Sequence, residues 1–259
     1  MSYQFVEKQV YVNDYKISYL EGGTGTNTEP ILFIHGWGVS IEPYQEIINV
    51  LCQRYKVIAP ALPAFGRSDG DQIDWNYDKY ADFLLAFLQK LDINKVHLIG
   101  HSLGGGISIT LAARVPDIVS RLILVDSTGI PVAPIPKVLF QRIIEMTAQT
   151  PQIKFPQLQQ IFKGFSYNLL FHTQNTIQIL LLTLKKDIKS LLPQIESPCL
   201  VVWGAKDLTT PLNAGQEFHQ GIKNSKLIVV EKGYHEWSIF FVDKITKIIF
   251  NFLEEIVID

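Results

Sequence analysis

A serine, an aspartate and a histidine stand at three points of this chain from which their side chains could act together in nucleophilic catalysis. Ser102 lies in the pentapeptide Gly-His-Ser-Leu-Gly at residues 100–104, Asp207 follows an apolar run, and His235 lies in Gly-Tyr-His. A serine hydroxyl is a weak nucleophile at neutral pH, an imidazole can take its proton, and a carboxylate fixes the imidazole tautomer. We therefore predict Ser102 as nucleophile, His235 as base and Asp207 as the acid that orients the base.

The residues around Ser102 have the order of strand, sharp turn and helix. The apolar run 96–99 leads directly into the pentapeptide, and a helix-like segment follows it. The two glycines of the pentapeptide allow the backbone to pack tightly around a serine held at strained dihedrals, so the hydroxyl stands at the end of a strand. The pattern predicts a nucleophile elbow.

A second loop, His-Gly-Trp-Gly at residues 35–38, follows the apolar run 31–34. We expect the backbone N–H of Trp37 to join that of Leu103 in an oxyanion hole. Both loops would lie at the carboxyl ends of strands, where the sites of parallel α/β sheets are found.

The acid has one competitor, and other polar residues near the site have simpler interpretations. Asp126 ends a neighbouring apolar run, and a carboxylate there could also reach the histidine. Asp207 is favoured because it follows the first strand after a long insertion. Among the other five histidines, His35 and His101 are expected to orient loops by hydrogen bonds. Glu236 is expected to be exposed rather than catalytic.

Four motifs in this order resemble the α/β-hydrolase family, in its lid-bearing serine hydrolase and esterase branch. They are His-Gly-Trp-Gly at 35–38, Gly-His-Ser-Leu-Gly-Gly at 100–105, Trp-Gly-Ala-Lys-Asp with Pro211 at 203–211, and Gly-Tyr-His at 233–235. The likeness extends from about residue 5 to residue 256. It implies a triad in the chain order Ser, Asp, His, and Pro211 after Asp207, as in the family pattern, is a further reason to favour Asp207 as the acid. It also implies no cofactor and no metal.

The loop at residues 61–68 departs from the family pattern. Ala61 and Ala64 stand where Asp and Gly are usual in the loop that resembles it. The departure leaves the three predicted catalytic residues untouched, but it makes the shape of this loop near the site an open question.

Strand-like and helix-like segments alternate along the chain, which predicts an α/β fold with a mostly parallel sheet. The resemblance implies eight strands flanked by helices. The expected strands are 5–12, 15–21, 31–34, 55–59, 95–100, 119–125, 199–203 and 226–230, and the expected helices are 41–53, 77–91, 103–114, 213–220 and 238–256. The first two strands read as a β-hairpin that turns at Asn13-Asp14.

Residues 127–192 form a segment too long for an ordinary connection and too apolar for a linker. We predict that it is a helical lid inserted after the sixth strand, with helices near 137–148, 156–163, 165–172 and 174–190, and that residues 1–126 and 193–259 form the core domain. Its phenylalanines either line a substrate pocket or hold the lid together and onto the sheet. Phe140, Phe162 and Phe165 are the candidate substrate-binding residues.

Composition is typical of a globular enzyme: 47% of the 259 residues are hydrophobic, 19% are charged, and the net charge is −2. A chain with this net charge lacks the positive electrostatic potential that attracts nucleic acid, so nucleic-acid binding is not expected. Cys52 and Cys199 lie in apolar stretches and are expected to be buried free thiols.

The sequence has no N-terminus that resembles a signal peptide and no apolar run long enough to span a membrane. These features predict a cytoplasmic protein without stable membrane association. The oligomeric state cannot be inferred.

Three functions remain open. The first is hydrolysis of a carboxylic ester, thioester or lactone of a small apolar substrate through an acyl-enzyme. The second is carbon–carbon bond hydrolysis, or cofactor-free perhydrolysis or lyase chemistry, on the same triad; carbon–carbon hydrolases in the family commonly carry a Gly-Pro-Gly oxyanion loop, which differs from Gly-Trp-Gly at 36–38. The third is a slow-turnover receptor for a small molecule.

Overall fold

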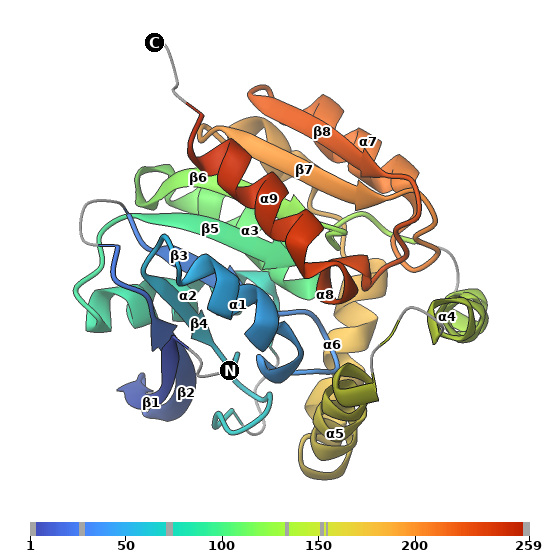
Figure 1. Ribbon diagram of the computed structural model, residues 1–259, viewed down its shortest axis with the longest axis horizontal. Coiled ribbons are helices and arrows are strands. Elements are labelled where there is room, and N and C mark those ends of the chain that lie inside the picture. The colour runs from blue at the N-terminus through green and yellow to red at the C-terminus, as the bar shows by residue number, and fades with distance from the viewer. Residues whose placement is uncertain are drawn as a thin grey trace.

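An eight-stranded sheet runs through the centre of the molecule, and helices cover both of its faces (Figure 1). The computed structural model describes residues 4–25, 29–70, 75–132, 135–150, 153 and 155–255. The strands are β1 (Phe5–Val12), β2 (Tyr15–Gly22), β3 (Ile31–Ile34), β4 (Val57–Pro60), β5 (Val96–His101), β6 (Val119–Val125), β7 (Cys199–Gly204) and β8 (Ser225–Val230).

The strands lie in the order β1-β2-β4-β3-β5-β6-β7-β8. The pairs β1–β2 and β2–β4 are antiparallel, and the other five pairs are parallel. The predicted α/β fold with a mostly parallel eight-stranded sheet is therefore confirmed. The parallel strands end along one edge, which is where the predicted catalytic loops lie.

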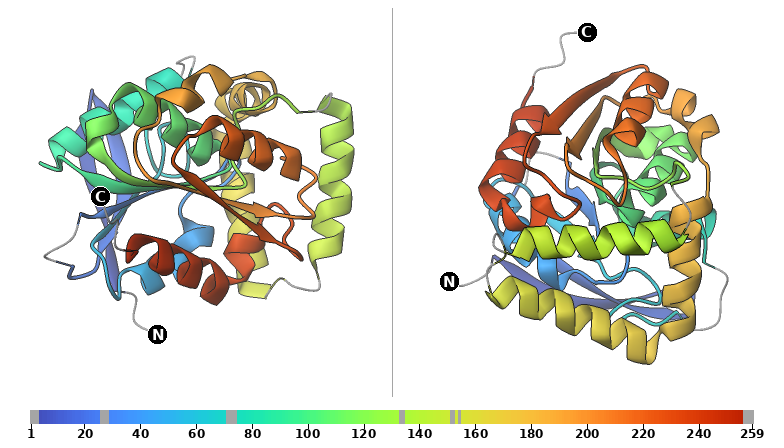
Figure 2. Two further views of the ribbon diagram at one scale, coloured as in Figure 1. Left: turned by 90° about the horizontal axis from the view of Figure 1, so that it is seen from above. Right: turned by 90° about the vertical axis from the view of Figure 1, so that its right-hand side faces the viewer.

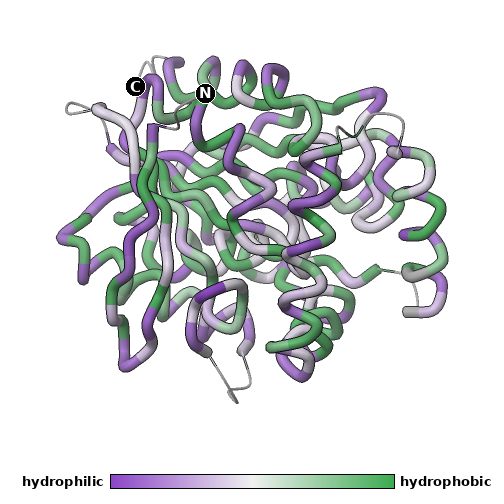
Figure 3. Tube along the Cα trace, turned by 60° about the horizontal axis from the view of Figure 1, so that its bottom comes forward, coloured by the Kyte–Doolittle hydropathy of each residue, from purple (hydrophilic) through white to green (hydrophobic). Residues whose placement is uncertain are grey.

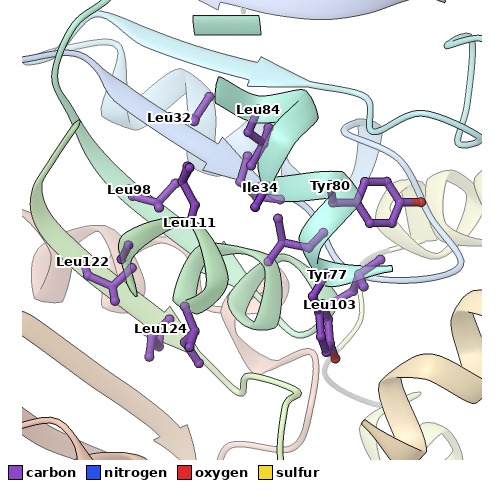
Figure 4. Packing of buried hydrophobic residues seen from close by; sticks show 14 of the residues in the cluster. Leu32, Ile34, Tyr77, Tyr80, Leu84, Leu98, Leu103, Leu111, Leu122 and Leu124 are labelled. Carbon is purple, nitrogen blue, oxygen red and sulfur yellow. The ribbon is translucent and has the colours of Figure 1, made fainter. Parts of the chain in front are cut away.

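Two apolar cores lie on opposite faces of the sheet. The helices of the first face are α2 (Tyr77–Lys90), α3 (Leu103–Arg114) and α7 (Leu212–Gly221), and those of the second are α1 (Gln45–Leu51), α8 (Trp237–Phe240) and α9 (Val242–Leu253). Figure 4 shows side chains of the first core, among them Ile34 and Leu98 from the strands, Leu84 from α2 and Leu111 from α3. Cys52 and Cys199 are buried free thiols, as expected.

Between β6 and β7 lie α4 (Ile135–Gln149), α5 (Phe155–Phe171) and α6 (Thr173–Lys185), followed by a 3₁₀ turn at Lys189–Gln194. We call residues 127–192, for which an insertion was predicted, the inserted segment. These helices lie beside the edge of the sheet at which the parallel strands end, and α4 and α5 stand farther out than α6 (Figures 1 and 2). Ile179 of α6 belongs to the first core. None of the helices that the structure describes is both long and apolar enough to cross a membrane.

Four of the predicted helices differ in continuity from the observed ones. The two expected near 156–163 and 165–172 are one continuous helix, α5, because a single interior glycine, Gly164, costs only about 1 kcal/mol and does not end a helix by itself. The helix expected at 41–53 begins with a 3₁₀ turn at Glu42–Tyr44, in which Pro43 takes an early position. The last expected helix is divided at Phe241 into α8 and α9.

Candidate active site

Ser102 occupies the turn between β5 and α3 in a strained backbone conformation, with φ of 52° and ψ of −117°. Two glycines make this turn sterically feasible. A Cβ on Gly100 would lie 2.3 Å from the carbonyl oxygen of Gly104, and a Cβ on Gly104 would lie 2.3 Å from that of Ile34. Because side-chain carbons do not approach oxygens so closely, the local sequence permits the expected elbow only with glycine at both positions.

Ser102, His235 and Asp207 are joined by two short hydrogen bonds. The Nε2 atom of His235 is 2.9 Å from Ser102 Oγ, and its Nδ1 atom is 2.8 Å from Asp207 Oδ2. All three residues are at most 7% exposed. The serine comes from the turn after β5, the aspartate from the loop after β7 and the histidine from the loop after β8, so three strands of the same half of the sheet supply the three side chains at their carboxyl ends.

The surroundings of Asp207 favour one tautomer of His235. Asp207 Oδ1 accepts hydrogen bonds from the backbone N–H groups of Thr209 and Thr210, at 2.8 and 2.7 Å, and Oδ2 accepts one from the Thr210 hydroxyl at 2.7 Å. An ionised carboxylate only accepts, so His235 Nδ1 carries the proton that it donates to Asp207. The lone pair of Nε2 then faces Ser102, as general-base chemistry requires.

Asp126, the alternative acid, makes different contacts. Its Oδ1 atom accepts a hydrogen bond of 2.7 Å from the backbone N–H of Gly204 at the end of β7. No hydrogen bond between described residues joins its carboxyl group to His235. Complete burial, together with the nearby Asp207 carboxylate, raises the pKa of Asp126 well above its usual range. The structure thus brings Asp207, and not Asp126, to the histidine.

A buried hydrogen-bond chain connects the loop at 35–38 with the loop that carries His235. The Gly36 N–H donates to the Tyr44 hydroxyl at 3.1 Å, this hydroxyl donates to His101 Nδ1 at 2.8 Å, and His101 Nε2 donates to the carbonyl oxygen of His235 at 3.0 Å. Burial lowers the pKa of His101 to about 3, so the ring is neutral, with one donor and one acceptor nitrogen. The expected loop-orienting role of His101 is confirmed.

His35 plays a similar part for the loop that departs from the family pattern. Its Nδ1 atom donates to the Gly36 carbonyl at 2.8 Å, and its Nε2 atom accepts from the Leu62 N–H at 3.0 Å. Burial lowers the pKa of His35 to about 4, which keeps this ring neutral as well. Ala64, in the same loop as Leu62, adopts a left-handed conformation with φ of 66°. The loop therefore keeps a glycine-like turn even though an alanine fills the position.

Of the two residues predicted to form an oxyanion hole, Leu103 follows Ser102 in the chain, and Trp37 follows Gly36, which lies close to Ser102 in space. A Cβ built on Gly36 would lie 3.4 Å from Ser102 Cβ, so the chain just before Trp37 passes against Ser102. Leu103 is the first residue of α3, and its N–H has no carbonyl one turn earlier to bond. The Trp37 indole donates a 2.8 Å hydrogen bond to the Thr176 carbonyl of α6, which ties this loop to the inserted segment.

Glu145 of α4 is a site residue that the sequence reasoning missed. Its side chain is completely buried. Its Oε1 atom accepts the backbone N–H groups of His235 at 2.9 Å and Leu208 at 3.2 Å, and Oε2 accepts the Thr209 hydroxyl at 2.7 Å. One carboxylate from the inserted segment therefore holds both the histidine loop and the loop of Asp207. A sequence signal existed, since Glu145 is the only acidic residue between Asp126 and Asp187.

Arg142, one turn before Glu145, forms an ion pair with Glu236 next to His235. Arg142 Nη1 lies 2.8 Å from Glu236 Oε2 and 3.2 Å from Glu145 Oε2, and Nη2 also contacts Glu236. The Glu236 side chain is only 14% exposed, so the expectation of an exposed residue was wrong. The sequence shows each charge but not its partner, because 94 residues separate Arg142 from Glu236.

A cavity of about 330 Å³ adjoins Ser102 and His235. Apolar side chains of the inserted segment form much of its wall, and Phe162 and Phe165 are among them. Phe140, the third phenylalanine expected there, is not among the lining residues and is 65% exposed. The reason is helical spacing: Val138 and Arg142 of α4 line the cavity, and Phe140, halfway between them in sequence, points to the opposite side of the helix.

Comparison with known proteins identifies the family. A sequence profile of the alpha/beta hydrolase fold matches residues 29–177. Uncharacterized proteins of Mycobacterium tuberculosis and Mycobacterium bovis are 38% identical over 119 residues, which are 46% of this chain and only 34% of theirs. A 2-hydroxy-6-oxononadienedioate/2-hydroxy-6-oxononatrienedioate hydrolase of Pseudomonas putida is 25% identical over 279 residues, with 96% of each protein covered.

A solved structure extends this similarity to three dimensions. The crystal structure of a putative lipase from Acinetobacter baumannii AYE matches with a TM-score of 0.83 and 25% identity, covering 96% of this chain and 91% of the lipase. The profile covers more than half of the chain, and the sheet order and the elbow agree with it. The protein belongs to the α/β-hydrolase fold family.

Proposed function

We propose that this protein hydrolyses uncharged carboxylic esters, thioesters or lactones with an apolar acyl part through an acyl-enzyme. The observation that carries the proposal is the series of hydrogen bonds from Ser102 Oγ through His235 to Asp207, 2.9 and 2.8 Å long, beside a largely apolar cavity. A hydroxyl, a base with a free lone pair and an orienting carboxylate are the groups that acyl transfer needs.

Each residue has one role in the proposed reaction. Ser102 Oγ attacks the carbonyl carbon while His235 Nε2 takes the hydroxyl proton, and the Leu103 and Trp37 N–H groups bind the developing oxyanion. The tetrahedral intermediate collapses, and His235 gives its proton to the departing alcohol or thiol. Water then attacks the acyl-enzyme with His235 again as base, which releases the acid and restores the serine. Asp207 stabilises the imidazolium in both halves.

The charges around the cavity support an uncharged substrate. Arg142 is the only Lys or Arg side chain among the described residues that line it. It is already paired with Glu145 and Glu236, so a substrate carboxylate would meet no free cation. Burying an unpaired carboxylate is costly, and a neutral acyl group avoids that cost.

Carbon–carbon bond hydrolysis is the second candidate, because the Pseudomonas putida relative is named for a dienedioate or trienedioate substrate and matches over 96% of this chain. The name of that substrate denotes a dicarboxylate. The paired state of Arg142 argues against the same substrate here, although an uncharged diketone would fit the same residues.

A substrate panel tests the proposal. Nitrophenyl esters from acetate to decanoate, neutral lactones, a neutral diketone and a hemisuccinate ester of matched length should be compared by kcat/KM. We expect the neutral esters to be turned over, the hemisuccinate to be much poorer, and a fluorophosphonate probe to label Ser102 alone. Faster cleavage of the diketone than of every ester would favour carbon–carbon hydrolysis. A single slow turnover followed by retained ligand would indicate a receptor.

A further inference from the structure

The outer faces of α4 and α5 carry large apolar side chains that nothing in the described protein covers. On α4, Phe140 and Ile143 are 65% and 66% exposed and lie one turn apart. On α5, Phe155, Phe162 and Leu169 recur every seven residues on one face and are 70%, 72% and 44% exposed. We call these five side chains the apolar patch. Outside the inserted segment, the exposed large apolar side chains among the described residues are Val6, Tyr11, Ile228 and Val229.

The charges next to the apolar patch are positive. Residues 127–192 contain seven Lys and Arg but two acidic residues, a net charge of +5 in a chain whose net charge is −2. On α4 and α5 the single carboxylate, Glu145, is completely buried, whereas Lys137 and Lys163 are exposed. Figure 3 shows the alternation of hydrophobic and hydrophilic residues along α4, the helix at the right-hand edge of that view. Apolar helix faces flanked by lysine are typical of segments that lie in an anionic lipid interface.

Part of the wall of the cavity beside Ser102 is formed by side chains that are also exposed on α4 and α5. Met146, Leu158, Phe162 and Phe165 all line the cavity, and each is also at least 37% exposed. Phe162 belongs to both the cavity wall and the apolar patch. An acyl chain that leaves a lipid phase at this point would therefore enter the cavity without crossing water.

We propose that α4 and α5 dock reversibly on an anionic phospholipid surface through the apolar patch, with Lys137 and Lys163 facing the lipid phosphates. A second copy of this chain fits less well, because pairing two such surfaces would bring their lysines together and close both cavity mouths. Docking of this kind needs no membrane span, because amphipathic helices enter only the headgroup region. It goes beyond the proposed hydrolysis, and its first test does not depend on turnover.

The test is cosedimentation of the 259-residue chain carrying Ser102→Ala with vesicles of phosphatidylcholine alone or with one third phosphatidylglycerol. We expect binding to the anionic vesicles only, weakening as salt rises. The double variant Phe155→Ser, Leu169→Ser should bind at least about tenfold more weakly, and Lys163→Glu several-fold more weakly. Tyr11→Ser, which removes an equally exposed aromatic side chain from the β1–β2 hairpin, is the matched control and should bind normally.

A second measurement separates docking from folding and from catalysis. When the double variant is made in the protein that retains Ser102, it should keep the wild-type turnover of a short soluble ester. Neither Phe155 nor Leu169 lines the cavity. Absence of binding to anionic vesicles, or equal binding by the double variant, would overturn the docking proposal. Concentration-dependent dimerisation that the double variant abolishes, without vesicle binding, would assign the patch to a second copy instead. Lack of any ester turnover, with docking intact, would refute only the proposed function.

Discussion

The edge of the sheet and the inserted segment are built in different ways. At the edge, Ser102, Asp207 and His235 are buried and fixed by hydrogen bonds to neighbouring backbone and side chains. In the inserted segment, each of the three helices exposes at least one large apolar side chain, and polar contacts such as those of Glu145 and Trp37 join the segment to the loops of the site. Buried, hydrogen-bonded side chains are suited to chemistry that needs fixed distances between atoms. A segment with exposed apolar side chains is suited to admitting substrates and to selecting among them.

The largest effect should come from the edge. If the protein is the proposed esterase, Ser102→Ala is expected to reduce ester turnover by about 10³-fold or more, because it removes the proposed nucleophile. The far-ultraviolet circular dichroism and the melting temperature should stay close to those of the wild type. Residual turnover near the wild-type rate would mean that another residue attacks the substrate.

Replacing the two aspartates should distinguish the acid from its neighbour. Asp207→Asn should lower kcat by roughly 10²- to 10⁴-fold, because an amide at this position favours the wrong tautomer of His235. Asp126→Asn should cost much less activity, since its carboxyl group bonds Gly204 instead. Steady-state measurement of kcat for both variants tests this prediction. A larger fall in kcat for Asp126→Asn than for Asp207→Asn would make Asp126 the acid.

Glu145 tests whether the inserted segment also supports the edge. Glu145→Ala removes the acceptor of the His235 and Leu208 N–H groups, so we expect a fall in kcat of about 10- to 100-fold through misplacement of the base. Glu145→Gln keeps an acceptor oxygen and should recover part of the loss. The control is Thr147→Ala on the same helix, whose hydroxyl bonds only the Ile143 carbonyl. If Glu145→Ala changed KM but not kcat, Glu145 would affect substrate binding and would not position His235.

Cavity side chains should change preference rather than rate. Phe162→Ala or Phe165→Ala is expected to shift kcat/KM between esters of neighbouring chain length by about 10- to 200-fold, since each lost methylene contact is worth about 1–3 kcal/mol. Phe140→Ala, which lies outside the cavity, should leave this preference unchanged. A uniform fall over all esters would indicate a misfolded inserted segment.

The smallest effect concerns stability alone. Ala64 has a φ of 66°, a conformation that costs an alanine about 1 kcal/mol relative to glycine. Ala64→Gly should therefore raise the free energy of unfolding by up to about 1 kcal/mol without changing turnover. Urea unfolding of the two proteins measures the difference, and a destabilised variant would show that Ala64 makes a packing contact of greater value.

Local sterics let the sequence determine much of the fold and the positions of the predicted catalytic residues. Asn13-Asp14 turns the first hairpin with φ of 48° and 70°, and α3 and β6 have the predicted bounds. The glycines around Ser102 specify the elbow in the same way, because only a residue without a Cβ fits there. The hairpin turn and the restriction on Gly100, which faces the Gly104 carbonyl, depend on neighbours within a few residues, so a single sequence records them directly. Gly104 is restricted by the Ile34 carbonyl of β3, so its steric reason became visible only in the fold.

Only the tertiary structure decided which side chains of the inserted segment face the site. Glu145 meets His235 across 90 residues of chain, and Arg142 meets Glu236 across 94, so no local pattern reveals either contact. The same rotation of α4 that buries Glu145 turns Phe140 outward. The face of a helix that becomes buried is set by its packing against distant elements, because intrahelical hydrogen bonds are identical for every rotation about the helix axis.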